Sequence, residues 1–436
     1  MKNFVSLQAN RNASMKKILI FLCGMVALTA CQSDDATTPP ALPAQRTVVV
    51  YMAAENDLSG YSNIDIEEMK VGRKAIQTSD NLVLFVDRAV ESEKPYIAKI
   101  NGEGTLEKLY EYPQDFLSSD PARMSEVLKR AIALCPATSD YGLVLWGHAN
   151  GWVIENDSVE SHSAQGPRRA YGRDTGDNTQ DRMKGSWLNI PSLRMALQNV
   201  GIRWKFIFAD CCNMAGVEVA YELRQQTDYL IASPAEIPGK GAPYQTMVKD
   251  FFIQNDQEMY QQIIEDYYAQ LDDIGGHTPL TAVKTALTPE LARVTRPLLP
   301  RVDAFLKGDK STQGMIYYYA FDRREEREKT LYDMNDVMRT ALGADDADYI
   351  QWKRLFDQAV YSKLSTKWFG QTIILSDFVT TQGGVNVFKH GNESYGGMSM
   401  FFPMEKYNHA AMSHQYNETT KKMAWYYAIG WSSIGW

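Results

Sequence analysis

The sequence TVVVYMA at residues 47–53 is an almost unbroken apolar run that contains three successive valines. Apolar runs that do not alternate with polar residues are typical of strands that are covered on both faces, as in a parallel sheet. Further runs of this kind follow along the chain, at residues 82–86, 141–146, 206–209 and 229–232.

Helical patterns lie between these runs, at residues 64–76, 124–134, 191–200 and 217–225. Strands that alternate with helices favour crossover connections, so the sequence predicts an α/β fold with a mainly parallel sheet and helices on both faces. The second half differs, because long aromatic-rich amphipathic segments are followed by strand-like stretches at 371–379 and 398–402. We expect a first domain at 47–255 and a C-terminal α+β region at 256–436.

Composition and charge limit the classes of function. The chain has 436 residues, of which 44% are hydrophobic and 22% charged, so it can bury a substantial core. Its formal net charge of -8 argues against nucleic acid as a partner, because a general grip on phosphates needs a basic surface.

The N-terminal segment has the features of an export signal. Lys16 and Lys17 precede an apolar run at 18–28 that is too short to span a bilayer. The following Leu-Thr-Ala-Cys, which ends at Cys31, resembles the lipobox of bacterial lipoproteins. This predicts a signal peptide at 1–30, a lipid anchor on Cys31 and a flexible tether at 31–46, with the protein held to the membrane of a bacterial cell envelope. An ordinary signal with a chance cysteine is the alternative, and the side of the membrane is left open.

Two chemically active side chains follow predicted strands. His148 comes directly after the run at 141–146, and Cys211 and Cys212 follow the run at 206–209. The carboxyl ends of parallel strands meet at one edge of a sheet, so an imidazole and a thiol would emerge together if these strands are neighbours. A thiol beside an imidazole and a helix N-terminus is suited to acyl transfer, and backbone N–H groups near Gly147 and Ala149 could stabilise the oxyanion.

The pattern alone leaves a structural role open for each of these residues. A histidine at a strand end is often structural, and a cysteine there is usually part of the packing. A competing interpretation is an envelope lipoprotein that binds peptide or glycan without turning it over. A third is a hydrolase or transferase that uses the same two residues on another acyl substrate, because a fold does not fix the substrate.

Several ordered blocks resemble the clostripain family of cysteine peptidases, which are relatives of the caspases and gingipains. The blocks are VVVYMAAENDLSGY at 48–61, LVLWGHANGW at 143–152 and the long stretch that begins FADCCNMAG at 208. Two later segments, TPLTAVKTALTPEL at 278–291 and YGGMSMFFP at 395–403, resemble the family more loosely. The resemblance implies a caspase-like α/β fold and endopeptidase activity on peptide or protein substrates through a His/Cys dyad.

The resemblance also assigns the dyad. His148 matches the family's histidine, and aligning Asp210 and Met214 with the family's Asp-Ala-Cys-x-Met block places Cys212 on the nucleophile and Cys211 on the alanine. The family commonly has glycine where this chain has Ala149, so the oxyanion geometry is the uncertain point of the match.

Substrate preference is less strongly marked. By analogy with the family we expect a basic P1 residue, which needs a carboxylate in its pocket. Asp210 could supply it, with Glu236 as a second candidate, although Asp210 could equally cap the helix expected after it. Lys240 stands where arginine-specific members carry an acidic residue, and a cation there should repel a basic P1 side chain.

The polar stretch at 155–186 is unusually long for a loop. Family members can be activated by cleavage in the corresponding linker, so this loop is a candidate for self-cleavage. The basic residues it offers are Arg168, Arg169, Arg173, Arg182 and Lys184. An ordinary solvated loop is the alternative.

Cofactor motifs are weak. The sequence has no His-Glu-x-x-His and no Cys-x-x-Cys, and we assign no metal ligand. Asp174, Asp177 and Asp181 could hold calcium, which some clostripain relatives require, but a solvated acidic turn is the favoured interpretation. We expect no certain cofactor and assign no oligomeric state.

Overall fold

The computed structural model describes residues 43–153, 171–181, 185–271, 278–308, 311–318, 329–364, 379–382, 385–408 and 415–436. Residues Leu42–Trp436 form one compact unit. The predicted signal peptide, Cys31, most of the tether and most of the loop at 155–186 lie outside the described residues, and so does nearly all of the strand-like stretch at 371–379.

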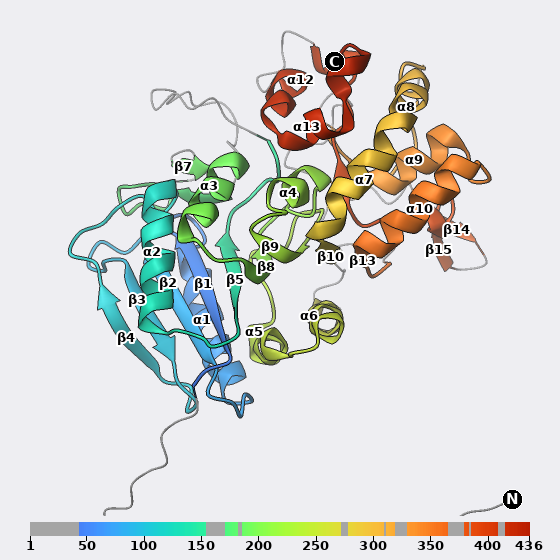
Figure 1. The fold of residues 1–436 in the computed structure, drawn as a ribbon. Helices are drawn as coiled ribbons and strands as arrows, with labels where there is room; N and C mark the ends of the chain where they lie inside the picture. The colour runs from blue at the N-terminus through green and yellow to red at the C-terminus, as the bar shows by residue number, and fades with distance from the viewer. Residues whose placement is uncertain are drawn as a thin grey trace, which may run out of the picture. The chain divides into compact units, whose positions relative to one another are not determined.

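A nine-stranded sheet forms the centre of this unit, with the order β13-β10-β9-β8-β5-β1-β2-β3-β4 (Figure 1). The five inner strands β9, β8, β5, β1 and β2 are parallel, and each of the two outer strands at either side pairs antiparallel with its inner neighbour. The bounds are β1 Arg46–Ala54, β2 Asn81–Arg88, β3 Tyr96–Ile100, β4 Leu106–Glu111, β5 Asp140–Gly147, β8 Trp204–Asp210, β9 Thr227–Ala232, β10 Thr281–Lys284 and β13 Val360–Ser362. The predicted α/β class with a mainly parallel sheet is confirmed.

Helices cover both faces of this sheet, and Figure 1 shows α2 lying across the strands. One face is covered by α1, α5 and α6, and the other by α2, α3, α4 and the C-terminal helices. The bounds are α1 Ser59–Arg73, α2 Pro121–Leu134, α3 Ile190–Val200, α4 Val217–Glu222, α5 Tyr244–Met247, α6 Asp256–Leu271, α7 Thr288–Thr295, α8 Leu299–Leu306, α9 Met334–Leu342, α10 Ala347–Ala359, α12 Tyr416–Thr419 and α13 Ala424–Ile429.

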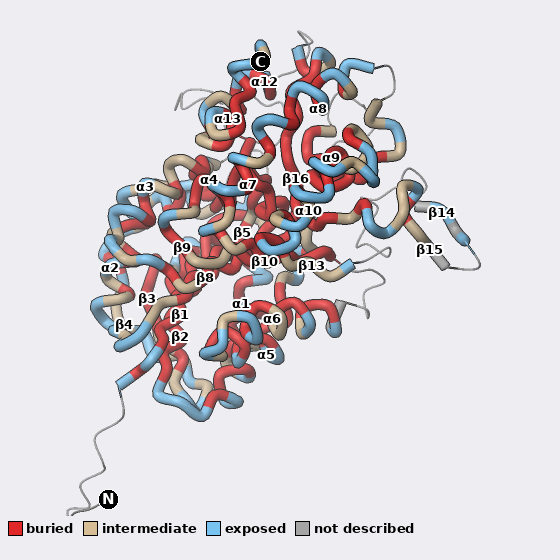
Figure 2. Tube along the Cα trace, turned by 45° about the vertical axis from the view of Figure 1, so that its right-hand side comes forward, coloured by how far each residue is buried: buried red, intermediate tan, exposed pale blue. Residues whose placement is uncertain are grey.

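The burial of strand β1 on both faces explains why its sequence is almost entirely apolar. Val49 and Tyr51 point into the core beneath α2, whereas Val48 and Val50 point into the core beneath α1, and all four are completely buried. Because successive side chains of a strand point to opposite faces, a strand covered on both sides has no position for a polar residue. Figure 2 shows the central strands as buried stretches between more exposed helices.

The C-terminal half is mainly helical and carries small sheets, as expected. These sheets consist of β11 Tyr317–Tyr318, β12 Leu331–Asp333 and β16 Ser399–Met400 in one, and β14 Val379–Gln382 with β15 Val385–Phe388 in another. A third small sheet, β6 Tyr171–Asp174 with β7 Ser186–Leu188, belongs to the first half. The C-terminal strand β10 pairs with β9, and β13 pairs with β10, so this half extends the main sheet. The division near residue 255 stays a prediction.

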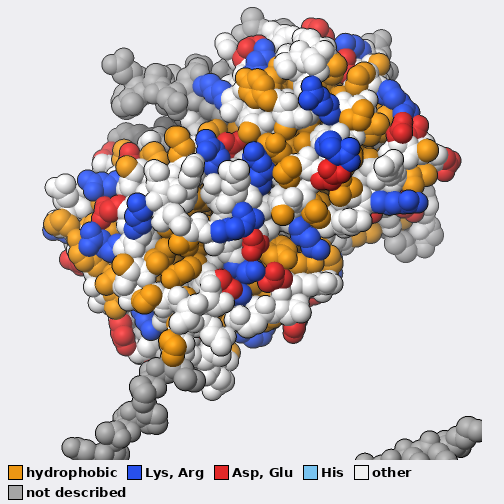
Figure 3. Space-filling model, viewed as in Figure 1, with side chains coloured by type: hydrophobic (Ala, Val, Ile, Leu, Met, Phe, Trp, Pro, Cys, Tyr) orange, Lys and Arg blue, Asp and Glu red, His pale blue; other side chains and the backbone are white. Residues whose placement is uncertain are grey.

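The surface carries both signs of charge. Figure 3 shows Lys and Arg side chains interspersed with Asp and Glu over the visible face. Within the described ranges, no helix combines the length and the apolar character that crossing a membrane requires.

Candidate active site

Strands β5 and β8 are neighbours, as the sequence analysis required. They pair in parallel, with Trp146 opposite Asp210, so His148 and Cys212 each lie two residues beyond a matched pair. Both residues line a pocket of about 230 Å³ at the carboxyl ends of these strands. The other residues of this pocket are Leu58, Trp146, Gly147, Asp210, Glu236, Ile237, Pro238, Gly239 and Gly241.

The two loops that carry His148 and Cys212 are fastened to each other. The Asn213 side chain donates from Nδ2 to Asn150 Oδ1 at 2.8 Å, and both residues are buried. A Cβ at Gly151, whose φ is +67°, would lie 2.6 Å from the Asn213 carbonyl oxygen, so only glycine allows this approach. Asn213 itself adopts a left-handed conformation with φ of +61°. Sequence reasoning missed both asparagines.

Gly147 and Ala149 flank the histidine differently. Gly147 lines the pocket, has φ of +139° and leaves no room for a side chain, because a Cβ would lie 2.9 Å from the Ala53 carbonyl oxygen. Ala149 is buried, and it is absent from the residues with positive φ, so the alanine fits where the family commonly has glycine. The oxyanion roles of their N–H groups stay predictions.

The two adjacent cysteines occupy different environments. Cys211 is completely buried in the core, whereas Cys212 is only partly buried and lines the pocket. The Ile237 N–H donates to the Cys212 sulfur at 3.4 Å. Burial, followed by the nearby carboxylate of Glu236, raises the pKa of the Cys212 thiol to about 12. The thiol is therefore protonated at neutral pH in this arrangement.

The helix after the cysteines begins where the helical pattern at 217–225 predicts it, several residues beyond Cys212. Helix α4 starts at Val217, with Gly216 as its N-cap, and it is only six residues long. The turn around Asn213 separates Cys212 from it, so the expected helix N-terminus at the thiol is wrong.

The His148 imidazole is held by an aspartate that sequence reasoning missed. His148 Nε2 lies 2.9 Å from Asp57 Oδ1, and Arg173 of β6 also pairs with Asp57. Burial by itself would raise the pKa of Asp57, but the hydrogen bond with His148 and the charges of His148 and Arg173 hold it at about 2. Arg173 is buried. It is therefore no accessible site for self-cleavage.

Asp210 lies in the pocket but does not cap a helix. Its Oδ2 accepts hydrogen bonds from the Tyr244 hydroxyl at 2.7 Å and from the Ala242 N–H at 3.1 Å. Its Oδ1 is buried and has no hydrogen-bond partner among the described residues. Burial raises the pKa of Asp210 to about 6. The capping alternative is therefore wrong, and a carboxylate oxygen remains for another ligand.

A second buried carboxylate, Asp65 of α1, stands behind Asp210. Trp146 donates from Nε1 to Asp65 Oδ2 at 2.6 Å, and burial, followed by the charge of Asp210, raises the pKa of Asp65 to about 8. A Cβ on Gly241 would lie 2.9 Å from Asp210 Oδ2 and 3.1 Å from Asp65 Oδ2. Gly241 thus brings its backbone close to both carboxyl groups. In the sequence, the signal that could have pointed to Asp65 is a charged residue on the otherwise buried side of a helix.

Comparison with known proteins decides the family. The profile described as "Clostripain family" matches residues 50–436, which is most of the chain. The chain belongs to the clostripain family. It is therefore a cysteine protease, a hydrolase.

Two solved structures of clostripain-type proteases share this fold. One is a secreted C11 cysteine protease from Bacteroides thetaiotaomicron in complex with an irreversible peptide inhibitor, with 25% identity and a TM-score of 0.69 over 89% of this chain and 100% of that one. The other is an inactive zymogen C11 protease from Parabacteroides distasonis, with 24% identity and a TM-score of 0.67 over 89% of this chain and 99% of that one. Among curated proteins, none matches the chain.

The remaining candidate residues of this clostripain-family chain are placed as follows. Glu236 lines the pocket beside Cys212, whereas Lys240 is exposed and is not among the pocket residues. The Lys240 charge acts on Asp65 and Glu68, whose pKa values it lowers. Lys240 therefore does not support the expectation that a basic side chain is repelled inside the pocket.

The three aspartates considered for calcium do not gather. Asp174 is buried and accepts hydrogen bonds from the Ser118 hydroxyl and the Gly176 N–H, while Asp177 and Asp181 are exposed. The described carboxyl groups that do converge are different ones, Glu55, Asp87 and Asp115.

Proposed function

We propose that this clostripain-family protease is an endopeptidase with Cys212 as its nucleophile and His148 as its general acid and base. The carrying observation is that both side chains line one pocket at the carboxyl ends of neighbouring strands, and that this pocket also contains Asp210. The pairing of an imidazole with a thiol at this edge suits acyl transfer to sulfur.

The first half of the reaction cleaves the peptide bond. The Cys212 thiol passes its proton to His148 and its sulfur attacks the scissile carbonyl carbon, so that the carbonyl oxygen becomes an oxyanion. We expect backbone N–H groups near Gly147 and Ala149 to stabilise this charge. His148 then gives the proton to the leaving amine, the C–N bond breaks, and a thioester with Cys212 remains.

The second half restores the enzyme. His148 takes a proton from a water molecule, whose oxygen attacks the thioester carbonyl. The C–S bond breaks, the thiol regains its proton from His148, and the new carboxyl terminus leaves. Asp57 and Arg173 act as positioning residues in both halves, because Asp57 fixes the orientation of the imidazole through Nε2.

A basic P1 residue suits the pocket. Asp210 offers a buried oxygen without a hydrogen-bond partner among the described residues, and Asp65 adds a second carboxyl group behind it. A guanidinium or ammonium group would neutralise this acidic end, and Glu236 lines the same pocket. We therefore propose cleavage after arginine or lysine.

Self-cleavage and lipid anchoring belong to the same proposal. The segment at 154–170 contains Arg168 and Arg169, which a protease of this specificity could cut. The Leu-Thr-Ala-Cys ending at Cys31 supports a lipid anchor in a bacterial cell envelope. Replacing Cys31 with serine should abolish metabolic incorporation of labelled palmitate. Retained label on this variant would exclude the anchor.

A peptide library digested by wild type, Cys212→Ala, His148→Ala and Cys211→Ala tests the function. Mass spectrometry of the products should show cuts after basic residues with wild type and with Cys211→Ala, and none with the other two. A thiol-reactive probe should label Cys212 and lose most of its labelling in His148→Ala. Cleavage by Cys212→Ala, or its loss in Cys211→Ala with Cys212 intact, would refute the assignment. Binding of peptides without cleavage by wild type would favour the alternative of a binding protein.

A further inference from the structure

Trp187 is a large aromatic side chain that belongs to neither hydrophobic core. It is half-buried, and among the described tryptophans it alone packs against neither of the two core clusters. Its ring lies beside that of His148, with 6.2 Å between the ring centroids and 51° between the ring planes. Its indole N–H donates no hydrogen bond to a described residue. A tryptophan that is kept out of the core beside a reactive side chain is typical of a surface that contacts a ligand.

The strand that carries Trp187 fixes the direction of the indole. The next residue of β7, Leu188, is 1% exposed and belongs to the core beneath α2. Because successive side chains of a strand point to opposite faces, the indole is directed away from that core. β7 pairs with β6, in which Tyr171 stands opposite Leu188. Trp187 is therefore held by a paired strand rather than by a free loop.

The small sheet of β6 and β7 also holds the backbone around His148. The Gly172 N–H donates to the His148 carbonyl oxygen at 2.9 Å. Ala149, the next residue of the histidine loop, forms an isolated bridge with Tyr171. Trp187 and His148 are therefore carried by one connected framework, which fixes the distance between their rings.

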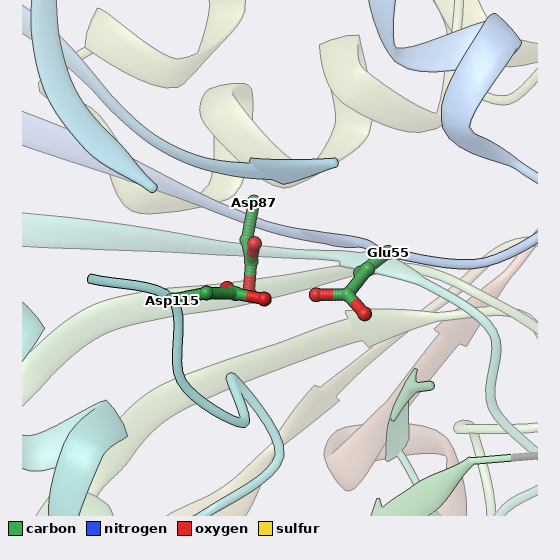
Figure 4. Close-up of side chains that lie close together, drawn as sticks. All are labelled: Glu55, Asp87 and Asp115. Atoms are coloured by element: carbon green, nitrogen blue, oxygen red, sulfur yellow. The ribbon is translucent and has the colours of Figure 1, made fainter. Parts of the chain in front are cut away.

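The segment that follows β6 is fastened as well. The Thr175 hydroxyl and the Asn178 N–H donate to Glu55 Oε1 at 2.9 Å and 2.8 Å. Glu55 directly follows β1, and Figure 4 shows its carboxyl group pointing toward those of Asp87 and Asp115. The sheet that carries the indole is thus anchored to the centre of the fold on both sides of β6. A substrate could bind against the indole without first having to order it, which lowers the cost of binding.

Trp187 lies outside the pocket that is proposed to receive the P1 side chain. His148 lines this pocket and Trp187 does not, so the indole extends the site beyond the imidazole. In the proposed reaction His148 gives its proton to the leaving amine, which must then lie within hydrogen-bond reach of the imidazole. The residue that carries this amine is P1′. Its side chain is therefore expected next to the imidazole, on the side away from the P1 pocket, where Trp187 stands.

We propose that Trp187 forms the subsite for the P1′ residue of the substrate and selects large apolar side chains there. The inference rests on the proposed function, because it takes the direction of the substrate from the role of His148. An aliphatic side chain gains contact area on the half-exposed indole, and an aromatic side chain adds a contact between rings. Glycine at P1′ would leave the indole uncovered.

Three peptides that have arginine at P1 and phenylalanine, leucine or glycine at P1′ test this subsite. Wild type should cleave the phenylalanine and leucine peptides with about tenfold higher kcat/KM than the glycine peptide. Trp187→Ala should remove this preference, whereas Trp187→Phe should keep most of it. Tyr61→Ala is the matched control, because Tyr61 is a 40% exposed ring that lies close to Gly239 of the P1 pocket. This control should keep the wild-type preference at P1′.

An arginine methyl ester separates substrate selection from a merely structural role, since its leaving group carries no side chain. Trp187→Ala should hydrolyse this ester with a kcat/KM within about threefold of wild type. Trp187→Gln takes its place if Trp187→Ala does not fold.

Three results would overturn the subsite. One is an equal loss on the ester and on all three peptides, which would leave Trp187 as a positioning residue for His148. The second is a wild-type preference at P1′ that is flat or that survives in Trp187→Ala, and the third is its loss in Tyr61→Ala. A wild type that cleaves none of these substrates would instead refute the proposed function, and the subsite with it.

Discussion

Replacing Gly147 with alanine should destabilise the fold and impair catalysis together. Gly147 is the last residue of β5, stands opposite Ala53 of β1 and directly precedes His148. Its φ of +139° is rarely adopted by residues with a side chain, and an added Cβ would lie 2.9 Å from the Ala53 carbonyl oxygen. A backbone oxygen of a strand that is paired on both sides cannot turn away as a flexible side chain would.

Two terms contribute to the expected loss of stability. Holding an alanine in a sparsely populated backbone conformation costs about 1–3 kcal/mol. Inserting an atom into a tightly packed place costs about 1–3 kcal/mol more. The sum of about 2–6 kcal/mol is a large share of the roughly 5–15 kcal/mol by which a typical domain is stable.

Urea unfolding in the inactive Cys212→Ala background measures the loss of stability, and kcat/KM of the active enzyme measures the loss of catalysis. The variant should lose at least tenfold in kcat/KM at a temperature where it is still folded, because a backbone shift at 147 moves the imidazole. Gly60→Ala is the matched control, since nothing lies within 4 Å of its added Cβ and its φ is not positive. This control should be neutral or slightly stabilising.

A Gly147→Ala protein with the stability and activity of Gly60→Ala would refute the reasoning. That outcome would mean that β1 and β5 can separate at this point without a penalty. The close approach could then not be what positions His148. A loss of stability without a loss of activity would refute only the expectation that the backbone shift at residue 147 moves the imidazole.

Three further predictions follow from the same contacts. Asp57→Asn should lower the free energy of unfolding by about 2 kcal/mol at pH 7, because the pKa of Asp57 is held at about 2 in the folded protein. Urea unfolding should show that this deficit shrinks as the pH falls from about 4 toward 2, and a deficit that stays constant would contradict the ion-pair explanation. Asp210→Asn should reduce kcat/KM at least tenfold for substrates with arginine at P1 and little for substrates with alanine at P1. Wild type should lose its preference for arginine below a pH of about 6, where Asp210 gains a proton, and an unchanged preference would show that Asp210 does not determine the specificity of the pocket. Asn213→Ala should cost about 2–3 kcal/mol, because it loses the bond to Asn150 and strains the left-handed backbone, whereas Asn213→Gly, which also loses that bond but tolerates the left-handed backbone, should cost about 1 kcal/mol in the same unfolding assay. Equal losses for the two variants would show that the backbone conformation of residue 213 does not contribute.

The central strands were predictable because burial on both faces dictates their composition. The apolar run at 47–53 corresponds to β1 at Arg46–Ala54, and the run at 141–146 corresponds to β5 at Asp140–Gly147. The adjacent residues Val48 and Val49 face different cores. This follows from the strand alone, because successive side chains of a strand point to opposite faces. The order of the strands was not predicted, and β5 pairs with β1 rather than with the preceding parallel strand β2.

The edge strands gave no comparable signal. In β4 the side chains are partly or fully exposed, and LEKLYE mixes charged with apolar residues. Such a strand is specified by its partner β3 rather than by its own composition, because only one of its edges is paired. It was therefore not distinguished from a loop.

The groups around the dyad could not be predicted for a different reason. Asp57 contacts His148 across 91 positions of sequence and Arg173 across 116. Local patterns are silent about such distances, and an aspartate in a loop after a strand is usually solvated. The candidate residues His148 and Cys212 were singled out because each follows a strand closely and parallel strands end at one edge of a sheet, and the family resemblance then favoured Cys212 over Cys211.

The environment of Cys212 links substrate binding to the chemistry of the proposed mechanism. A thiol with a pKa of about 12 is ionised in only about one molecule in 10⁵ at pH 7, which corresponds to about 7 kcal/mol. Burial is the main cause, but Glu236 and Asp210 also raise this pKa through their charges. A cationic P1 side chain bound between these carboxylates would cancel their effect on the sulfur. The acidic pocket that selects the substrate would then disfavour the thiolate further when it is empty, and a bound basic residue would remove this part of the penalty before His148 receives the proton, while the larger part that burial causes remains.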